Sequence, residues 1–390
     1  MARKRSEKIN LPLDITLEIL KKLPTKSLAR FHCVSYRWAS IIREFIIVND
    51  SIVTQRPRDP HFIFHRMTQC LTDQSTLRAF SSHETFSIFS YTYLQRQITN
   101  EEQLYHEKVF GNGKVRRATF QYVRGLIGFW FQGSNQFKIH NPTTSTKTVF
   151  LPIERLPTSC SFLFGYDPFK NQYKVLCLPR YYQKECCKVF ILEDSLNMWW
   201  DIECDIGHQS PCEQAVCISG VIYYRAKSKK NWSYVLMSFH LRSDKFKLVQ
   251  IPENLPLDDK DTTLVNYQGK LGCICRINDE DVDMWVMEDA EKQEWLKITF
   301  GSMLQDLSTW DIRFAGVTNP GGEIVIVHRE YLSEFTLDVY YYDPEQKIRR
   351  RVEIQTPTSL LRVRPSDILT IWAVTDHVEN IMCFPKVSVS

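Results

Sequence analysis

The chain has 390 residues, of which 43% are hydrophobic and 24% charged, the composition of a globular protein large enough for two or three domains. Its 49 Lys and Arg against 45 Asp and Glu leave a net charge of +4, too balanced to indicate nucleic-acid or membrane binding. No apolar run is long enough for a transmembrane helix, and the N-terminus lacks the apolar stretch of a signal peptide. We therefore expect a protein of the cytoplasm and/or nucleus that is not secreted.

Residues 11–24, LPLDITLEILKKLP, form the first predicted helix, with a proline near each end. Its aliphatic side chains cover about 200° of the helical wheel and are interrupted only by Thr16, whereas burying one face needs a stripe of little more than 100°. We expect Leu17 to face a small interior. The excess apolar surface should remain exposed as an interface, on Pro12, Ile15, Ile19 and Leu23.

Two further short helices are predicted after this one. Thr25 is a suitable N-cap for TKSLARFHCV, and Ser35 for YRWASIIREF, in which apolar residues recur at helical spacing from Trp38 to Phe45. Three helices in about 35 residues make a segment shorter than a single hydrophobic core usually needs, and no cysteine pair or metal motif supplies a staple. The helical part is therefore expected to need a partner.

After the helices the sequence changes to short runs of alternating apolar and polar residues, rich in Tyr, Phe, Trp, Val and Ile. We assign 1–50 to the helical domain, 51–60 to a linker and 61–390 to an all-β domain. Glycines typical of hairpins recur at about 50-residue spacing, at Gly125, Gly220, Gly269, Gly321 and Gly322, and YDPFKNQYKVL at 166–176 fills the gap between the first two.

This spacing predicts a β-propeller of about six blades. Five four-strand units fit between 115 and 355. A sixth combines the C-terminal ILTIWAVTDHVENIMCFP with HFIFHRM and LRAFSS, the first strands after the linker, which closes the ring and removes exposed sheet edges. The alternative is an open pair of β-sandwiches.

No motif for catalysis, metal binding or a cofactor is found. The chain lacks a P-loop, a G-x-S-x-G elbow, H-E-x-x-H and C-x-x-C, and the acidic stretches DDKD and NDEDVD read as solvated loops. We expect the twelve cysteines to be reduced, and those in strand-like text to behave as small buried hydrophobes: Cys177, Cys217, Cys273 and Cys275. The sequence thus predicts a protein that binds rather than catalyses.

Binding by a propeller would use loops on a rigid ring. Candidate target-binding aromatics in or near such loops are Tyr181, Tyr182, Trp232 and Trp310, with Trp199 and Trp200 as further loop aromatics. Most aromatics of this kind are expected to lie in the core of the blades instead.

Two stretches resemble known families. Residues 11–42, LPLDITLEILKKLPTKSLARFHCVSYRWASII, closely resemble the F-box. The rest is similar to the plant F-box-associated interaction domain, on the evidence of VRGLIGF, NPTTSTKTVFLP, FGYDPFKNQYKVL, CISGVIYY, WVMEDAEKQEW and YYDPEQKIRRRVEI. The resemblance implies a helical F-box followed by a target-recognition domain.

The resemblance also implies partners. An F-box docks on an adaptor of the Skp type, which is bound to a cullin, and the associated domain recruits the protein to be ubiquitinated. Adaptor contacts would then fall on Leu11, Pro12, Ile15, Ile19, Leu20, Leu23, Pro24, Leu28, Val34 and Trp38. One departure is Ser35-Tyr36-Arg37-Trp38 where the family usually has Ser-Lys-x-Trp, which predicts weaker adaptor affinity.

Three functions follow as hypotheses. The first is a non-catalytic substrate receptor of an SCF-type ubiquitin ligase, which acts by proximity. The second is an adaptor-binding scaffold or competitor that delivers no target. The third, a propeller enzyme, is disfavoured by the missing catalytic motifs.

Overall fold

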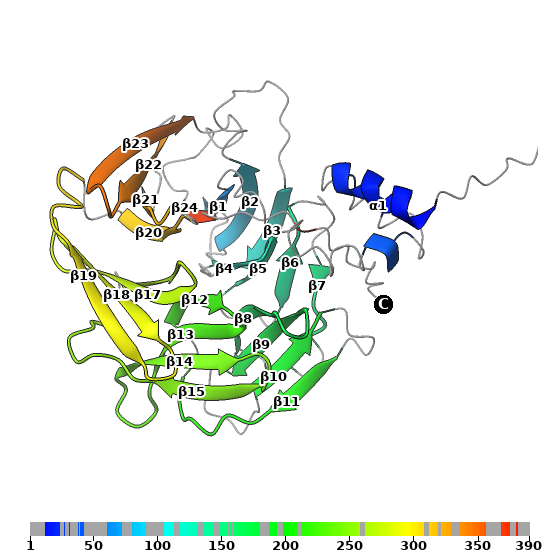
Figure 1. Cartoon of the computed structure of the whole chain (residues 1–390), viewed down its shortest axis with the longest axis horizontal. Helices are drawn as coiled ribbons and strands as arrows, with labels where there is room; N and C mark the ends of the chain where they lie inside the picture. The colour runs from blue at the N-terminus through cyan, green and yellow to red at the C-terminus, as the bar shows by residue number, and fades with distance from the viewer. Residues whose placement is uncertain are drawn as a thin grey trace, which may run out of the picture.

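A computed structural model of the whole chain describes residues 12–23, 27, 31, 38, 40–42, 61–71, 80–90, 105–112, 118–131, 136–142, 149–153, 156–157, 160–179, 187–192, 198–209, 212–257, 262–307, 312–318, 321–328, 336–355, 368–374 and 380. One helix, α1 (Leu13–Lys22), precedes twenty-four strands in these ranges. Strands surround a common centre, and α1 lies to one side of them (Figure 1). The order of helix first and strands afterwards is the one predicted from the sequence.

The strands form four-stranded antiparallel sheets. Five sheets are each built from strands that are consecutive in the chain, with the first strand innermost. They comprise β4 (Ala118–Val123), β5 (Leu126–Phe131), β6 (Phe137–His140) and β7 (Val149–Phe150); β8 (Cys160–Asp167), β9 (Gln172–Pro179), β10 (Cys187–Ile191) and β11 (Trp199–Ile202); β12 (Cys212–Ile218), β13 (Val221–Lys227), β14 (Tyr234–His240) and β15 (Lys245–Val249); β16 (Thr263–Tyr267), β17 (Lys270–Arg276), β18 (Val282–Asp289) and β19 (Glu294–Phe300); and β20 (Ile312–Val317), β21 (Ile324–His328), β22 (Thr336–Asp343) and β23 (Ile348–Gln355).

A further four-stranded sheet joins the two ends of the all-β domain. The C-terminal strand β24 (Ile368–Val374) pairs with β1 (His61–Leu71), which continues to β2 (Phe80–Ser90) and β3 (Tyr105–Asn112). In its register His61 lies opposite Val374 and Met67 opposite Ile368. This is the shared sheet predicted from the sequence, and pairing of this kind leaves no free edge between the two ends of the domain.

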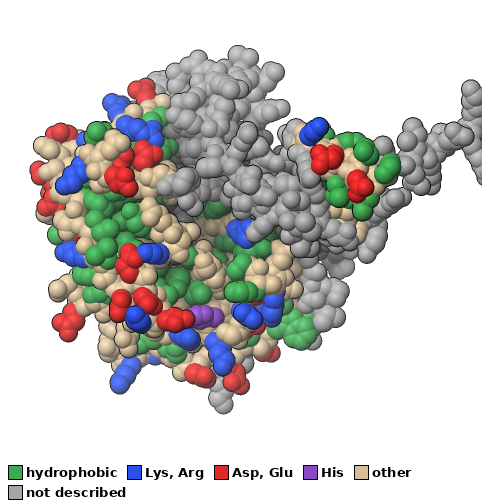
Figure 2. All heavy atoms as spheres, viewed as in Figure 1, with side chains coloured by type: hydrophobic (Ala, Val, Ile, Leu, Met, Phe, Trp, Pro, Cys, Tyr) green, Lys and Arg blue, Asp and Glu red, His purple; other side chains and the backbone are tan. Residues whose placement is uncertain are grey.

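Neighbouring sheets contact one another through their innermost strands, which run β4, β8, β12, β16, β20 and β24 around the centre. Sheets arranged radially in this way define a β-propeller, so the predicted all-β propeller is confirmed and the open sandwich pair is wrong. Acidic and basic side chains are interspersed over the described part of the face seen in Figure 2. That mixture fits the small net charge of the chain.

Glycine turns connect the first two strands of several sheets. In the β4–β5, β12–β13 and β16–β17 hairpins two residues with positive φ form the loop, and the second is a glycine; at Ser219-Gly220 the φ angles are 47° and 81°. Two-residue loops of this kind match the twist of antiparallel strands, and glycine adopts the left-handed conformation without a Cβ penalty. The hairpin glycines predicted from the sequence therefore have a structural cause.

Aspartates organise a second set of turns, which join β8 to β9, β18 to β19 and β22 to β23. Asp167, Asp289 and Asp343 each accept hydrogen bonds from the backbone N–H groups two and three residues later, at 2.8–3.4 Å. Side-chain acceptance of this kind replaces backbone pairing where the chain reverses. The three turns thus share one hydrogen-bond pattern.

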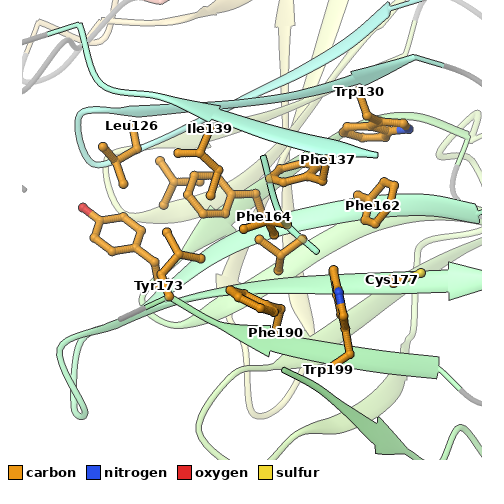
Figure 3. Close-up of a cluster of buried hydrophobic side chains, with 14 of the residues drawn as sticks. Leu126, Trp130, Phe137, Ile139, Phe162, Phe164, Tyr173, Cys177, Phe190 and Trp199 are labelled. Atoms are coloured by element: carbon orange, nitrogen blue, oxygen red, sulfur yellow. The ribbon is translucent and has the colours of Figure 1, made fainter. Parts of the chain in front are cut away.

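The core consists of clusters between adjacent sheets. In the largest aromatic cluster, side chains from β5 and β6 meet side chains from β8 to β11 (Figure 3). Phe137 and Phe162 have ring centroids 5.3 Å apart, and Phe190 and Trp199 are equally close. Aromatic pairs at this separation contribute about 0.5–1.5 kcal/mol beyond simple burial. The aromatic side chains of this cluster therefore pack one sheet against the next.

Cysteines also contribute to these clusters. Cys177, Cys273 and Cys275 are fully buried, as predicted, whereas Cys217 is half-buried. Among the side chains that the structure describes, seven cysteines are free thiols. Burial raises the pKa of the Cys273 thiol well above its ordinary value, so it behaves as a small hydrophobe.

Candidate functional site

Helix α1 begins at a proline, whose carbonyl oxygen organises the first turn. Pro12 O accepts hydrogen bonds from the backbone N–H and the hydroxyl of Thr16, both at 3.0 Å. The hydroxyl is thereby satisfied, which explains how a polar residue within the apolar arc is only 5% exposed. Asp14 lies in the first turn, where a negative charge complements the helix dipole.

The inner face of α1 packs on the last described helical residues. Leu20 is 1% exposed and lies against Ile42, which is completely buried. Leu17, Leu23, Trp38 and Ile41 pack around this pair. Among the described residues of this segment, Leu20 and Ile42 are the two fully buried hydrophobics of the cluster.

The outer face of α1 leaves large apolar side chains exposed. Leu13 is 55% exposed, Ile15 50% and Ile19 44%, and Pro12 is also exposed. Hydrophobic side chains are visible beside acidic and basic ones on this helix in Figure 2. We call the four residues Pro12, Leu13, Ile15 and Ile19 the α1 apolar face.

The energy available at this face is considerable. Fully burying an isoleucine or leucine contributes about 1.5–3 kcal/mol, so covering what remains exposed on Leu13, Ile15 and Ile19 would contribute about 2–4 kcal/mol. A patch of this kind on a small domain marks a site of interaction. The α1 apolar face is therefore the strongest candidate for a docking surface among the described residues.

A second exposed feature lies on the propeller, at the tip of the β13–β14 hairpin. Trp232 is 59% exposed and has a φ of +60°, and its N–H donates to Ser228 O at 3.0 Å. Asn231 Oδ1 accepts hydrogen bonds from the backbone and the hydroxyl of Ser233. The tryptophan is thus held in the left-handed region and exposed to solvent, and its role as a target contact stays a prediction.

The other predicted aromatics divide between core and surface. Trp199 is buried and donates from Nε1 to Pro152 O at 2.7 Å, whereas its neighbour Trp200 is 43% exposed on the outer strand β11. Successive residues of a strand point to opposite faces, which explains the contrast. Tyr181, Tyr182 and Trp310 lie outside the described residues.

Buried charges in the propeller act as structural links. Lys174 of β9 is 1% exposed, and its Nζ donates to Leu241 O at 2.6 Å and to Asp244 at 2.8 Å, across two neighbouring sheets.

His140 is also buried, and desolvation lowers its pKa to about 3, so this histidine is neutral at pH 7.

Neither a metal cluster nor a membrane span is found in the part of the chain that the structure describes. No three His, Cys, Asp or Glu side chains gather there at ligand distance. The described helix is too short and too polar to cross a membrane.

Comparison with known families now places both parts of the molecule. Residues 9–49 match the F-box domain, and residues 75–378 match the F-box associated beta propeller domain. The second match alone covers more than half of the chain. The chain belongs to the F-box proteins.

Relatives in Arabidopsis thaliana match most of the chain. This F-box protein is 39% identical to Putative F-box protein At5g50220 over 384 residues, which cover 97% of this chain and 92% of the relative. It is 42% identical to Putative F-box protein At1g32420 over 302 residues, covering 75% and 91%. A solved structure of a Nidogen/Laminin complex also aligns with this chain. The alignment covers 83% of this chain and 100% of that chain, at a TM-score of 0.41 and 10% identity, a similarity too low to carry a conclusion.

Within the F-box match, the structure sorts the residues predicted to contact an adaptor. Three of them are exposed on the α1 apolar face: Pro12, Ile15 and Ile19. Leu23 and Trp38 are half-buried and pack on the small core, and the Trp38 ring lies 5.3 Å from that of Phe31. Leu11, Pro24, Leu28 and Val34 lie outside the described residues.

Burial differs from the expectation at three positions of this F-box protein. Leu23 was expected to stay exposed, but it is half-buried against the small core. Leu20 was expected to contact the adaptor, but it is buried against Ile42, so its side chain stabilises the helix instead of offering a surface. Leu13 was not among the residues expected to stay exposed, although it is 55% exposed. Its place in the apolar arc of the helical wheel was the signal that could have identified it.

Proposed function

We propose that this F-box protein is a non-catalytic substrate-receptor subunit of an SCF-type ubiquitin ligase. The α1 apolar face binds a Skp-like adaptor and, through it, a cullin. The propeller binds a target protein, which is thereby held near the ubiquitin-charged enzyme. The mechanism is proximity: binding raises the effective concentration of the target's lysines.

The observation that carries this proposal is the exposure of Ile15 and Ile19 on a helix that belongs to the F-box match. These side chains lie one helical turn apart, the spacing with which an amphipathic helix presents anchors to a groove in another protein. The turns and outer strands of the propeller, with Trp232 among them, supply a separate surface for the target.

An adaptor-binding scaffold or competitor would use the same α1 face and differ only in the fate of the target. The two functions are distinguished by the lifetime of bound proteins. A receptor predicts at least one propeller-bound protein that becomes longer-lived when this chain is removed, and a competitor predicts none.

The test is co-purification of the full chain with a plant Skp-type adaptor. Ile15→Ser/Ile19→Ser should abolish capture. The matched control is Leu248→Ser/Leu296→Ser, which removes two equally exposed apolar side chains from the outer strands β15 and β19 of the propeller. Circular dichroism of each variant checks that the fold is retained. No capture of the adaptor by the wild-type chain would contradict the proposal.

A further inference from the structure

The most exposed large hydrophobic side chain among the described residues lies in the turn between β8 and β9. Phe169 is 71% exposed, more than Trp232 at 59%. The guanidinium of Arg242, in the β14–β15 turn of the neighbouring sheet, lies over the phenyl ring, with Cζ 4.5 Å from the ring centroid. An arginine stacked on an exposed ring combines positive charge with apolar area at one point of the surface.

Hydrogen bonds and packing hold the turn that carries Phe169. Asp167 is completely buried, and its Oδ1 accepts hydrogen bonds from the N–H groups of Phe169 and Lys170, at 2.9 and 3.4 Å. Pro168 packs on the β12–β13 turn so closely that a Cβ at Gly220 would lie 2.9 Å from Pro168 Cδ. The backbone that presents the phenyl ring is therefore fixed by the fold.

The turn that carries Arg242 is fixed by the buried Lys174. Its Nζ donates to Leu241 O at 2.6 Å and to Asp244 at 2.8 Å, so it holds the β14–β15 turn on both sides of Arg242. Lys174 belongs to β9, which is part of the same hairpin as Phe169. One buried side chain thus ties the two turns together, and the stacked pair is held on rigid elements.

A second arginine lies beside the same hairpin. Arg124, in the β4–β5 turn, has its Cζ 4.3 Å from the ring centroid of Tyr166, and Lys170 is exposed in the β8–β9 turn itself. Among the described side chains of these three turns, the carboxylate of Asp167 is buried and that of Asp244 is held in an ion pair. The charge that these turns expose is therefore positive.

We propose that Arg124, Phe169, Lys170 and Arg242 form the surface that binds the target, and that the bound segment is acidic and carries an aromatic or aliphatic side chain. This inference rests on the proposed function, in which the propeller holds a target protein. The phenyl ring supplies an apolar anchor, and the cations attract carboxylates. A guanidinium pairs with a carboxylate through its edge while its face stays on a ring. Fixed turns also lose little freedom on binding.

A short protein segment fits this surface better than a nucleic acid does. Nucleic-acid affinity comes from many phosphate contacts, which need a broad basic surface. The chain has a net charge of only +4, and the β23 residues Arg350 and Arg351 are paired with Glu323 and Asp338. Three cations in neighbouring turns match the few carboxylates of a peptide.

The test is selection from a phage-displayed library of random twelve-residue peptides on the full-length protein. The selected peptides should be enriched in Asp and Glu and contain an aromatic or aliphatic residue. Measured by fluorescence anisotropy, Phe169→Ala and Arg242→Glu should each weaken their binding about tenfold or more. The matched control, Lys347→Ala/Ile348→Ala, removes an exposed cation and an exposed apolar side chain at the start of β23 and should bind like the wild-type chain.

Circular dichroism and the urea midpoint should be unchanged in each variant, because the substituted side chains are exposed. The proposal is overturned if no peptide is selected, if the selected peptides are rich in Lys and Arg, or if they bind Phe169→Ala as tightly as the wild-type chain. Tighter binding of a twelve-nucleotide single-stranded RNA at the same residues would also overturn it.

Capture of a plant Skp-type adaptor is the separate readout for the proposed function. Phe169→Ala and Arg242→Glu should capture the adaptor like the wild-type chain, because α1 is unchanged. Failure of peptide selection with adaptor capture intact would refute this surface and leave the receptor role standing. Failure of capture by the wild-type chain would contradict the receptor role itself.

Discussion

The ion pair between Lys174 and Asp244 predicts an asymmetric response to mutation. Lys174 is 1% exposed, whereas Asp244 is 36% exposed at the β14–β15 turn of the next sheet. Lys174→Met keeps most of the apolar stem, returns Asp244 to water and leaves Leu241 O without its donor. We expect a loss of about 1–2 kcal/mol in the free energy of unfolding.

Asp244→Asn should cost more. Asparagine keeps the side-chain shape and tolerates the φ of 53° at this position, so the backbone is not strained. The change nevertheless leaves the Lys174 ammonium without its counter-charge inside the protein. Removing one partner of a fully buried pair costs about 3–5 kcal/mol, and the partial exposure of Asp244 reduces our expectation to about 2–4 kcal/mol.

The assay is urea unfolding of the full chain, followed by tryptophan fluorescence. The double variant should be about as stable as Lys174→Met alone, because the asparagine costs little once the ammonium is gone. Additive losses, or a larger loss for Lys174→Met than for Asp244→Asn, would refute the reasoning that this pair is held by the burial of the lysine.

Two further predictions concern the propeller. His140 is buried with its pKa lowered by desolvation, so stability present above pH 6.5 is lost as pH falls towards 3; between pH 7 and pH 5 the loss is about 1–2 kcal/mol, and His140→Leu should remove that part of the decrease in urea midpoint. Gly165→Ala should cost about 1–3 kcal/mol in urea unfolding, since a Cβ would lie 2.7–2.8 Å from Leu241 and Ile222. Gly301→Ala should change stability by less than about 0.5 kcal/mol, because its Cβ would meet only Asp281 Oδ1, at an ordinary contact distance of 3.7 Å. Equal urea midpoints for the two glycine variants would contradict the close packing at Gly165.

Periodic features of the sequence predicted the fold well. The turns at Gly125, Gly220 and Gly269 need a left-handed backbone, so glycine there reports local structure directly. Spacing of these turns then predicted the repeated sheets and the sheet shared between the ends of the domain. Local chemistry and period are enough for such features because each repeat forms the same hairpins.

Burial on helix α1 was harder to predict. The helical wheel gives one wide apolar arc, within which Leu20 is buried and Ile15 and Ile19 are exposed. That division depends on where Ile42 and Trp38 pack, which is a tertiary contact. Thr16 is buried for a similar reason, because its hydroxyl finds Pro12 O.

The contact between His208 and Tyr224 could not be predicted from spacing. His208 lies in the connection after β11 and Tyr224 in β13, and no motif joins them in the sequence. Backbone hydrogen bonds from Gln209 to Lys227 and from Lys229 to Gly207 bring the two side chains together.

The most direct test of the central claim is the affinity of the full chain for a plant Skp-type adaptor, measured by isothermal titration calorimetry. Ile15 and Ile19 are 50% and 44% exposed, so losing the burial of both side chains would cost about 1.4–2.8 kcal/mol, a weakening of about tenfold to a hundredfold for Ile15→Ser/Ile19→Ser. Leu248→Ser/Leu296→Ser should bind like the wild-type chain. Equal affinity for all three proteins, or no heat of binding with the wild-type chain, would contradict the assignment of the α1 apolar face as the adaptor site.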